Sequence, residues 1–131
     1  MAANKFPETF YVEATQSTPE IKLDKENSLI EMSGRSLPEN VKEFYGPVID
    51  WLDEYVKSPN DKTKVVLNFE YFNTASSKMI MDILEKIKKI QENGKEIDVD
   101  WCYIEEDDDM LEAGEDYSEI TEVPFNFISY E

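Results

Sequence analysis

The sequence predicts a single α/β domain with a mixed β-sheet and two main helices packed on one face of that sheet. Near the N-terminus, two short segments alternate apolar and polar residues, which predicts an antiparallel hairpin. Farther along, strand-like and helix-like patterns alternate, and such strand–helix–strand units form right-handed parallel crossovers. A length of 131 residues, 40% of them hydrophobic, suffices for one hydrophobic core.

The N-terminal part is expected to contribute three strands. Residues 10–14 form a short first strand, and a turn follows because Pro19 lacks a backbone donor and biases its predecessor to extended geometry. Glu20–Asp24 and residues 29–32 alternate with a period of two on either side of a polar turn at residues 25–27. These two segments form the predicted hairpin.

A first helix is expected to begin after Ser36. Ser36 is the predicted N-cap, with Pro38 in the first turn and Glu39 three residues after the cap. Because a proline inside a helix loses a hydrogen bond, Pro47 predicts a kink or two abutting helices. Residues 58–60 end the element. Its apolar stripe consists of Val41, Phe44, Tyr45, Val48, Leu52, Tyr55 and Val56.

The middle of the chain predicts a central strand followed by a long helix. Residues 64–72 are almost continuously apolar, which favours a strand buried on both faces. Residues 75–93 have isoleucine and leucine at helical spacing, and Asn93 with Gly94 gives a left-handed stop. Residues 97–103 alternate again and form the next strand.

The C-terminal part is strongly acidic. Residues 105–109 are five consecutive carboxylates and are expected to be a mobile linker without an ordered metal site. Residues 110–118 predict a weak helix, and residues 125–128 a closing strand. The prediction is therefore one domain over residues 1–131, with an acidic segment from about residue 104.

The charge is unevenly distributed along the chain. The net charge is −17, and residues 96–131 contain fourteen acidic and no basic side chains, whereas residues 1–95 contain sixteen acidic and thirteen basic ones. Such a field repels nucleic acid and anionic membranes, so neither is an expected partner. A partner protein with a basic patch fits this negative charge better than nucleic acid or a membrane does. The alternative is that the acids serve solubility alone.

Composition and motifs argue against an enzyme. Histidine is absent, which removes the commonest general base and metal ligand. Neither a dinucleotide fingerprint nor a phosphate-binding loop occurs, and residues 105–109 lack the spacing of a calcium loop. Asp98 and Asp100 share one side of a strand, where an exposed, solubilising role is the simplest interpretation. We expect no catalytic residue, cofactor or metal.

Cellular location is inferred from the cysteine count and the N-terminus. Cys102 is the only cysteine, so no intramolecular disulfide is possible and a reducing compartment is indicated. Residues 1–7 lack an apolar signal core, and no apolar run approaches the roughly 20 residues of a membrane span. The cytoplasm is the expected location.

One segment points to a functional site, at the junction between the central strand and the second helix. Thr74, Ser76 and Ser77 place three hydroxyls in the first helical turn, where backbone N–H groups lack partners and the dipole is positive. A phosphate there would find those donors. Lys78 lies in the same turn, which contains no acidic residue to offset its positive charge. The alternative is that Asn73 and Thr74 merely cap the helix.

This segment also resembles a known family. Residues 71–84, YFNTASSKMIMDIL, closely resemble the SiaC family of regulatory phosphoproteins. Residues 15–21, TQSTPEI, and residues 38–51, which begin PEN and end FYGPVIDW, agree with that family as well. The resemblance spans about residues 14–103 in order and spacing.

The resemblance implies a fold similar to STAS domains, the anti-sigma-factor antagonists, and a phosphorylation switch in cyclic di-GMP signalling. Thr74 would be the phosphoacceptor, and Asn73, Ser76, Ser77 and Lys78 would contribute to partner binding. A dedicated protein kinase would modify Thr74, and a metal-dependent serine/threonine phosphatase would restore it. The unphosphorylated protein would bind and activate a diguanylate cyclase.

The sequence departs in two places from the pattern of the family that it resembles. Ala75 stands where the family commonly has a serine, so a second acceptor is lost. The glycine pair typical of true STAS antagonists after the phosphosite is absent, which argues against a literal sigma-factor role. The alternatives are a constitutive interaction or scaffold domain, or an antagonist-like partner switch, in which Thr74 is only a helix cap. A metal-dependent enzyme using the acidic residues comes third.

Overall fold

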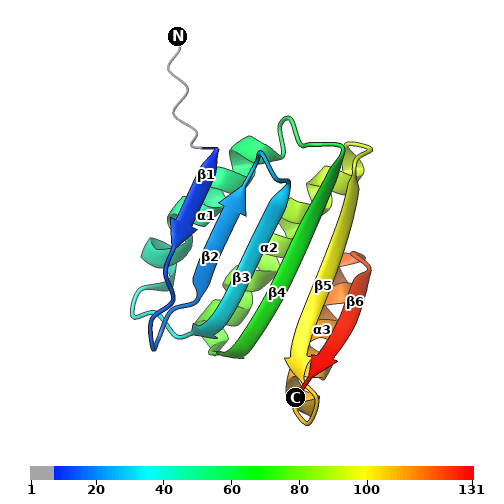
Figure 1. Cartoon of the computed structure of the whole chain (residues 1–131). Coiled ribbons are helices and arrows are strands. Elements are labelled where there is room, and N and C mark those ends of the chain that lie inside the picture. Colours follow the sequence, from blue (N-terminus) through cyan, green and yellow to red (C-terminus); the bar gives the residue numbers. More distant parts are fainter. Residues whose placement is uncertain (1–7) are drawn as a thin grey trace.

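Six strands form one sheet in which the spatial order follows the sequence order, β1-β2-β3-β4-β5-β6 (Figure 1). The structure, a computed structural model, describes residues 8–131, so the predicted absence of a signal segment in residues 1–7 lies outside the described residues. The elements are β1 Thr9–Val12, β2 Glu20–Asp24, β3 Leu29–Ser36, α1 Val41–Tyr55, β4 Lys62–Phe72, α2 Thr74–Glu92, β5 Glu96–Ile104, α3 Asp108–Thr121 and β6 Phe125–Tyr130.

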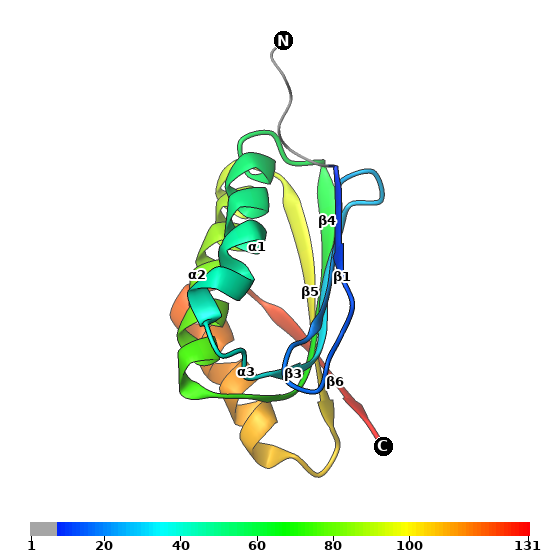
Figure 2. The ribbon, with the colours of Figure 1, turned by 90° about the vertical axis from the view of Figure 1, so that its left-hand side faces the viewer.

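The sheet is mixed, as predicted. β1, β2 and β3 pair antiparallel, whereas β3, β4, β5 and β6 pair parallel. Each parallel connection runs through a helix, and Figure 2 shows α1, α2 and α3 on the same face of the sheet. The predicted α/β fold with an N-terminal hairpin and both main helices on one face is confirmed, with α3 as a further helix on that face.

The prediction that β4 is buried on both faces is wrong. Along β4 the buried residues alternate with half-buried ones: Val65, Leu67 and Phe69 are at most 2% exposed, while Val66 is only half-buried. The cause is the one-sided helix layer, because a second buried face would need helices on the other side of the sheet. The other face of the sheet carries mainly polar side chains, among them Lys64, Asn68 and Asp98.

The core lies between this sheet and the helices, and α3 is seated on Trp101. The Trp101 indole is fully buried and donates to the Met110 carbonyl at 2.9 Å. A Cβ at Gly114 would lie only 2.5 Å from the Trp101 ring. Only a glycine therefore lets α3 approach the sheet this closely at that point.

The start of α1 differs from the prediction. Asn40, rather than Ser36, is the N-cap, since its side chain accepts from the Glu43 N–H at 3.0 Å. Ser36 is instead the buried last residue of β3. The helix continues through Pro47 as one element, so of the two predicted outcomes, a kink or two abutting helices, the second is wrong.

The acidic run at residues 105–109 is not the linker that its charge suggests. Glu105 and Glu106 form a turn, Asp107 caps α3 by accepting from the Met110 N–H at 3.0 Å, and Asp108 and Asp109 begin the helix. Carboxylates are stabilised at the start of a helix because the helix N-terminus is positive.

Among residues 8–131, no helix is long and apolar enough to cross a membrane.

Candidate functional site

The candidate site lies where β4 turns into α2. Asn73 has an extended backbone, with φ −89° and ψ 178°, and its side chain accepts from the Ser76 N–H at 2.9 Å. Its backbone N–H donates to the Ser36 carbonyl at 3.1 Å, which ties the junction to the end of β3. Asn73 is therefore the N-cap of α2, and the interpretation of Thr74 as the cap is wrong.

Thr74 is the first residue of α2 and is exposed. Its hydroxyl makes no hydrogen bond with any residue in the range 8–131. Lys78, one turn later, is also exposed and has no ion pair within that range. The predicted phosphoacceptor and the lysine predicted to lie beside it are thus both open to solvent.

Ser76 points the other way, into the protein. It is 0% exposed, and its hydroxyl donates to the Ser36 carbonyl at 3.0 Å and accepts from the Ser36 Oγ at 2.8 Å. The Ser36 Oγ is also 2.6 Å from the Tyr45 hydroxyl. Burial raises the pKa of Tyr45 to about 12. These three hydroxyls join β3, α1 and α2, so Ser76 holds the helix and is not presented to a partner.

Ser77 fixes the opposite side of the same helical turn. Its Oγ lies 2.9 Å from the Tyr117 hydroxyl, which also donates to the Ser77 carbonyl at 2.9 Å. Tyr117 belongs to α3, and burial raises the pKa of its phenol. The start of α2 is therefore held by α1 and β3 on one side and by α3 on the other.

The three helix N-termini lie at the same end of the sheet, where the parallel strands also end (Figure 1). The first turn of α1 contains Glu43 and that of α3 contains Asp108 and Asp109, whereas that of α2 contains no acid. The N-terminus of α2 is thus the one at which the positive dipole is not offset by a first-turn carboxylate. Such an end favours an anion.

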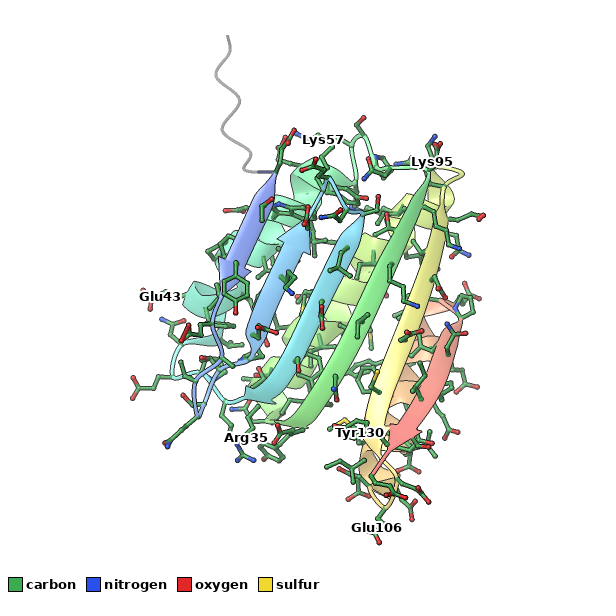
Figure 3. All side chains as sticks on the ribbon, viewed as in Figure 1. Arg35, Glu43, Lys57, Lys95, Glu106 and Tyr130 are labelled. Atoms are coloured by element: carbon green, nitrogen blue, oxygen red, sulfur yellow. The ribbon has the colours of Figure 1, made fainter. Side chains whose placement is uncertain are left out.

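Arg35 adds a further positive charge at this end of the sheet. It is the neighbour of Tyr71 in the β3–β4 pairing, and its guanidinium carbon lies 5.6 Å from the centroid of the Tyr71 ring. Figure 3 shows Arg35 where β3 and β4 end. Arg35 has no ion pair within residues 8–131.

Sequence reasoning found the exposed residues of this site but missed the ones that support them. Ser36 was assigned to a helix cap, and Tyr45 only to an apolar stripe. The contribution of Tyr117 was not anticipated, because it depends on the docking of α3. The one signal in the sequence was a hydroxyl side chain at a position of a helix that is otherwise apolar. Such a signal does not show which residue the hydroxyl will contact.

Other reactive groups in the described part of the chain are neutralised or inactive. Lys64 forms ion pairs of 2.9 Å with both Asp98 and Asp100, and Asn126 donates to the same two carboxylates. Burial raises the pKa of the half-buried Cys102 thiol, so it is not an activated nucleophile. Within residues 8–131 no group of three or more potential ligands could hold a metal ion.

Comparison with known proteins gives consistent results. The family described as SiaC family regulatory phosphoprotein matches residues 12–130. An uncharacterized protein of Pseudomonas aeruginosa strain UCBPP-PA14 is 32% identical over 115 residues, covering 88% of this chain and 91% of that protein.

Two crystal structures from the same organism are also similar. Apo-SiaC has a TM-score of 0.84 at 30% identity, covering 92% of this chain and 98% of that one. A structure of the diguanylate cyclase SiaD in complex with its activator SiaC has a TM-score of 0.86 at 30% identity, covering 92% and 99%.

Proposed function

This chain belongs to the SiaC family of regulatory phosphoproteins, and we propose that it is a non-enzymatic regulator switched by phosphorylation of Thr74. The unphosphorylated form binds and activates a signalling partner, which by likeness to the Pseudomonas aeruginosa complex is a diguanylate cyclase. A protein kinase adds the phosphate and a serine/threonine phosphatase removes it, both in the cytoplasm. The observation that carries the proposal is the exposed Thr74 hydroxyl, which has no hydrogen bond within residues 8–131.

The electrostatics of the α2 N-terminus support this assignment. A phosphate adds about −1.5 to −2 charges and three acceptor oxygens. It would meet backbone N–H donors and Lys78, with no first-turn carboxylate to oppose it. A kinase can reach the hydroxyl without unfolding the helix, because Thr74 takes no part in the cap.

The rigid support of this turn favours a switch that works at the surface. Ser76 and Ser77 are both bonded to other elements, so the start of α2 has little freedom to move. We expect Asn73, Thr74 and Lys78 to form the docking surface, with Ser76 and Ser77 acting from behind it. A phosphate on Thr74 then adds about −1.5 to −2 charges to a positive, hydrogen-bonding surface and makes it anionic, and the partner is released.

A constitutive interaction domain is the second candidate. It is favoured by the general tendency of hydroxyl residues to occupy helix starts for structural reasons. The finding that Asn73 supplies the cap weakens this candidate, because it leaves Thr74 without a structural task at that position.

The two candidates are separated by comparing variants in the cells that make the protein. Tagged wild type, Thr74→Ala, Thr74→Asp and Thr9→Asp are captured, and the captured material is assayed for synthesis of cyclic di-GMP from GTP. Thr9 is exposed on the edge strand β1, so Thr9→Asp matches the change of charge away from the site. Mass spectrometry of the wild type determines whether Thr74 carries a phosphate.

We expect Thr74→Asp to lower the captured cyclase activity about tenfold, which corresponds to about 1.4 kcal/mol of binding free energy. Thr74→Ala and Thr9→Asp should stay within about twofold of wild type. Equal capture by all four proteins, with no phosphate on Thr74, would leave the constitutive domain as the better account.

A further inference from the structure

The outer edge of β6 is an unprotected strand edge. Within residues 8–131 the sheet ends at β6, whose far side pairs with no other strand (Figure 1). Edge strands are usually protected by lysine, proline or a bulge. β6 has the sequence FNFISY, with no charge and no proline, and pairs with β5 in continuous register.

The backbone of β6 offers hydrogen-bonding groups toward this open side. The Tyr130 carbonyl accepts from the Glu105 N–H at 2.7 Å, so the peptide groups of residue 130 point toward β5. Because this direction alternates along a strand, those of Phe127 and Ser129 point outward. Phe127 and Ile128 are 38% and 42% exposed, which gives an incoming strand an apolar contact on each face of the sheet.

The helix that contacts β6, α3, belongs to the acidic C-terminal part of the chain, and few of the acids there are paired with a base. Of the fourteen acids in residues 96–131, only Asp98, Asp100 and Glu122 form ion pairs within the described residues 8–131, with Lys64 and Lys88. No group among the described residues is arranged for a metal ion. The exposed acids on α3 and the turn before it are Glu105, Glu106, Asp108, Asp109, Glu112, Glu115, Asp116 and Glu119.

We infer that the β6 edge is a second docking site, which binds an extended, basic segment of a partner protein by strand addition. Main-chain hydrogen bonds to β6 would supply affinity, and lysine or arginine side chains would meet the acids of α3. A second copy of this chain is a poor occupant, because it would bring the same fourteen acids and no bases to the edge. The inference rests on the β6 edge and on the acids of α3, and it is independent of Thr74.

The test uses a peptide probe and NMR. The probe is a blocked peptide of about ten residues that alternates valine or threonine with lysine, long enough to pair along the whole of β6. Two control peptides replace every lysine by glutamate, or place a proline at the centre. Amide shifts of the labelled full-length protein are followed during each titration.

We expect the basic peptide to shift the amides of β6 and to bind more weakly as salt is raised, while neither control peptide binds there. Ile128→Lys should weaken binding of the basic peptide about tenfold, because it places a like charge on the edge strand. Tyr11→Lys adds the same charge to the opposite edge strand and should change the affinity by less than about twofold. Amide spectra of both variants check that each remains folded.

Three results would overturn the inference. In the first, the basic peptide produces no shifts in β6. In the second, the proline peptide binds as tightly as the alternating one, which would mean non-specific charge attraction. In the third, the protein self-associates and Ile128→Lys abolishes that association, which would make a second copy the occupant.

Discussion

Replacing Asn73 by alanine isolates the cap of α2 from the hydroxyl beside it. The substitution removes the 2.9 Å hydrogen bond from the Ser76 N–H to the Asn73 side chain. It leaves the backbone bonds of residue 73 in place, both the one to the Ser36 carbonyl and the one from the Ser77 N–H. Thr74→Ala, in contrast, removes an exposed side chain that has no hydrogen bond within residues 8–131.

The magnitudes follow from these contacts. Loss of an asparagine cap costs about 1 kcal/mol, within a range of about 0.5–2 kcal/mol, whereas Thr74→Ala should stay within about 0.5 kcal/mol of wild type. Asn73→Asp keeps the accepting oxygen and adds a negative charge at the positive helix end. Its free energy of unfolding should therefore exceed that of wild type by about 0.3–1 kcal/mol. For a domain of this size, 1 kcal/mol corresponds to about 4 °C in Tm.

Urea denaturation of the four proteins measures these differences. The comparison is valid where the dependence of the unfolding free energy on urea is the same for all of them. If Thr74→Ala costs as much as Asn73→Ala, then Thr74 shares the capping role and its hydroxyl is not free for modification. If Asn73→Asp fails to recover the loss seen with alanine, the cap is not the source of that loss.

Two further changes test the packing around the site. Gly114→Ala places a Cβ 2.5 Å from the buried Trp101 ring, so calorimetry should find a loss of about 1–3 kcal/mol despite the better helix propensity of alanine; unchanged stability would mean that α3 is not seated as described. The pKa of Tyr45 is about 12 in the folded protein and near 10 in the unfolded chain. Its contribution to the free energy of unfolding is therefore complete below pH 10 and is lost as the pH rises to 12. That loss is on the order of 2–3 kcal/mol, and Tyr45→Phe should make the fall in unfolding free energy between pH 10 and 12 shallower; an equally steep fall would contradict the raised pKa.

The sequence was sufficient for the order of the elements and for the location of the exposed site. Period-two and helical spacing are local signals, and they correctly gave the hairpin, the parallel crossovers and the start of α2 near Thr74. The positive first turn of α2 was also readable, because it depends on neighbouring residues, whereas the sequence left both Asn73 and Thr74 open as the cap.

What the sequence could not give depends on contacts between distant segments. Ser36 precedes Pro38 and looks like a cap, but it ends β3 and is bonded to Ser76, forty residues away. The apolar character of β4 could not reveal that helices cover only one side of the sheet. The acidic run looked like a linker because charge repulsion is a local property, whereas the place of Asp107 depends on the helix that it caps.

The sequential strand order has a consequence for how the chain folds. Every strand pairs with the strand that precedes it, so no strand has to be inserted between two that are already joined. The entropy of closing each connection is therefore limited to the span of one hairpin or one crossover. During synthesis, each new strand finds its template already exposed and covers it in turn. We expect assembly to proceed from the N-terminal hairpin toward the C-terminus, with β6 the last strand to join the sheet.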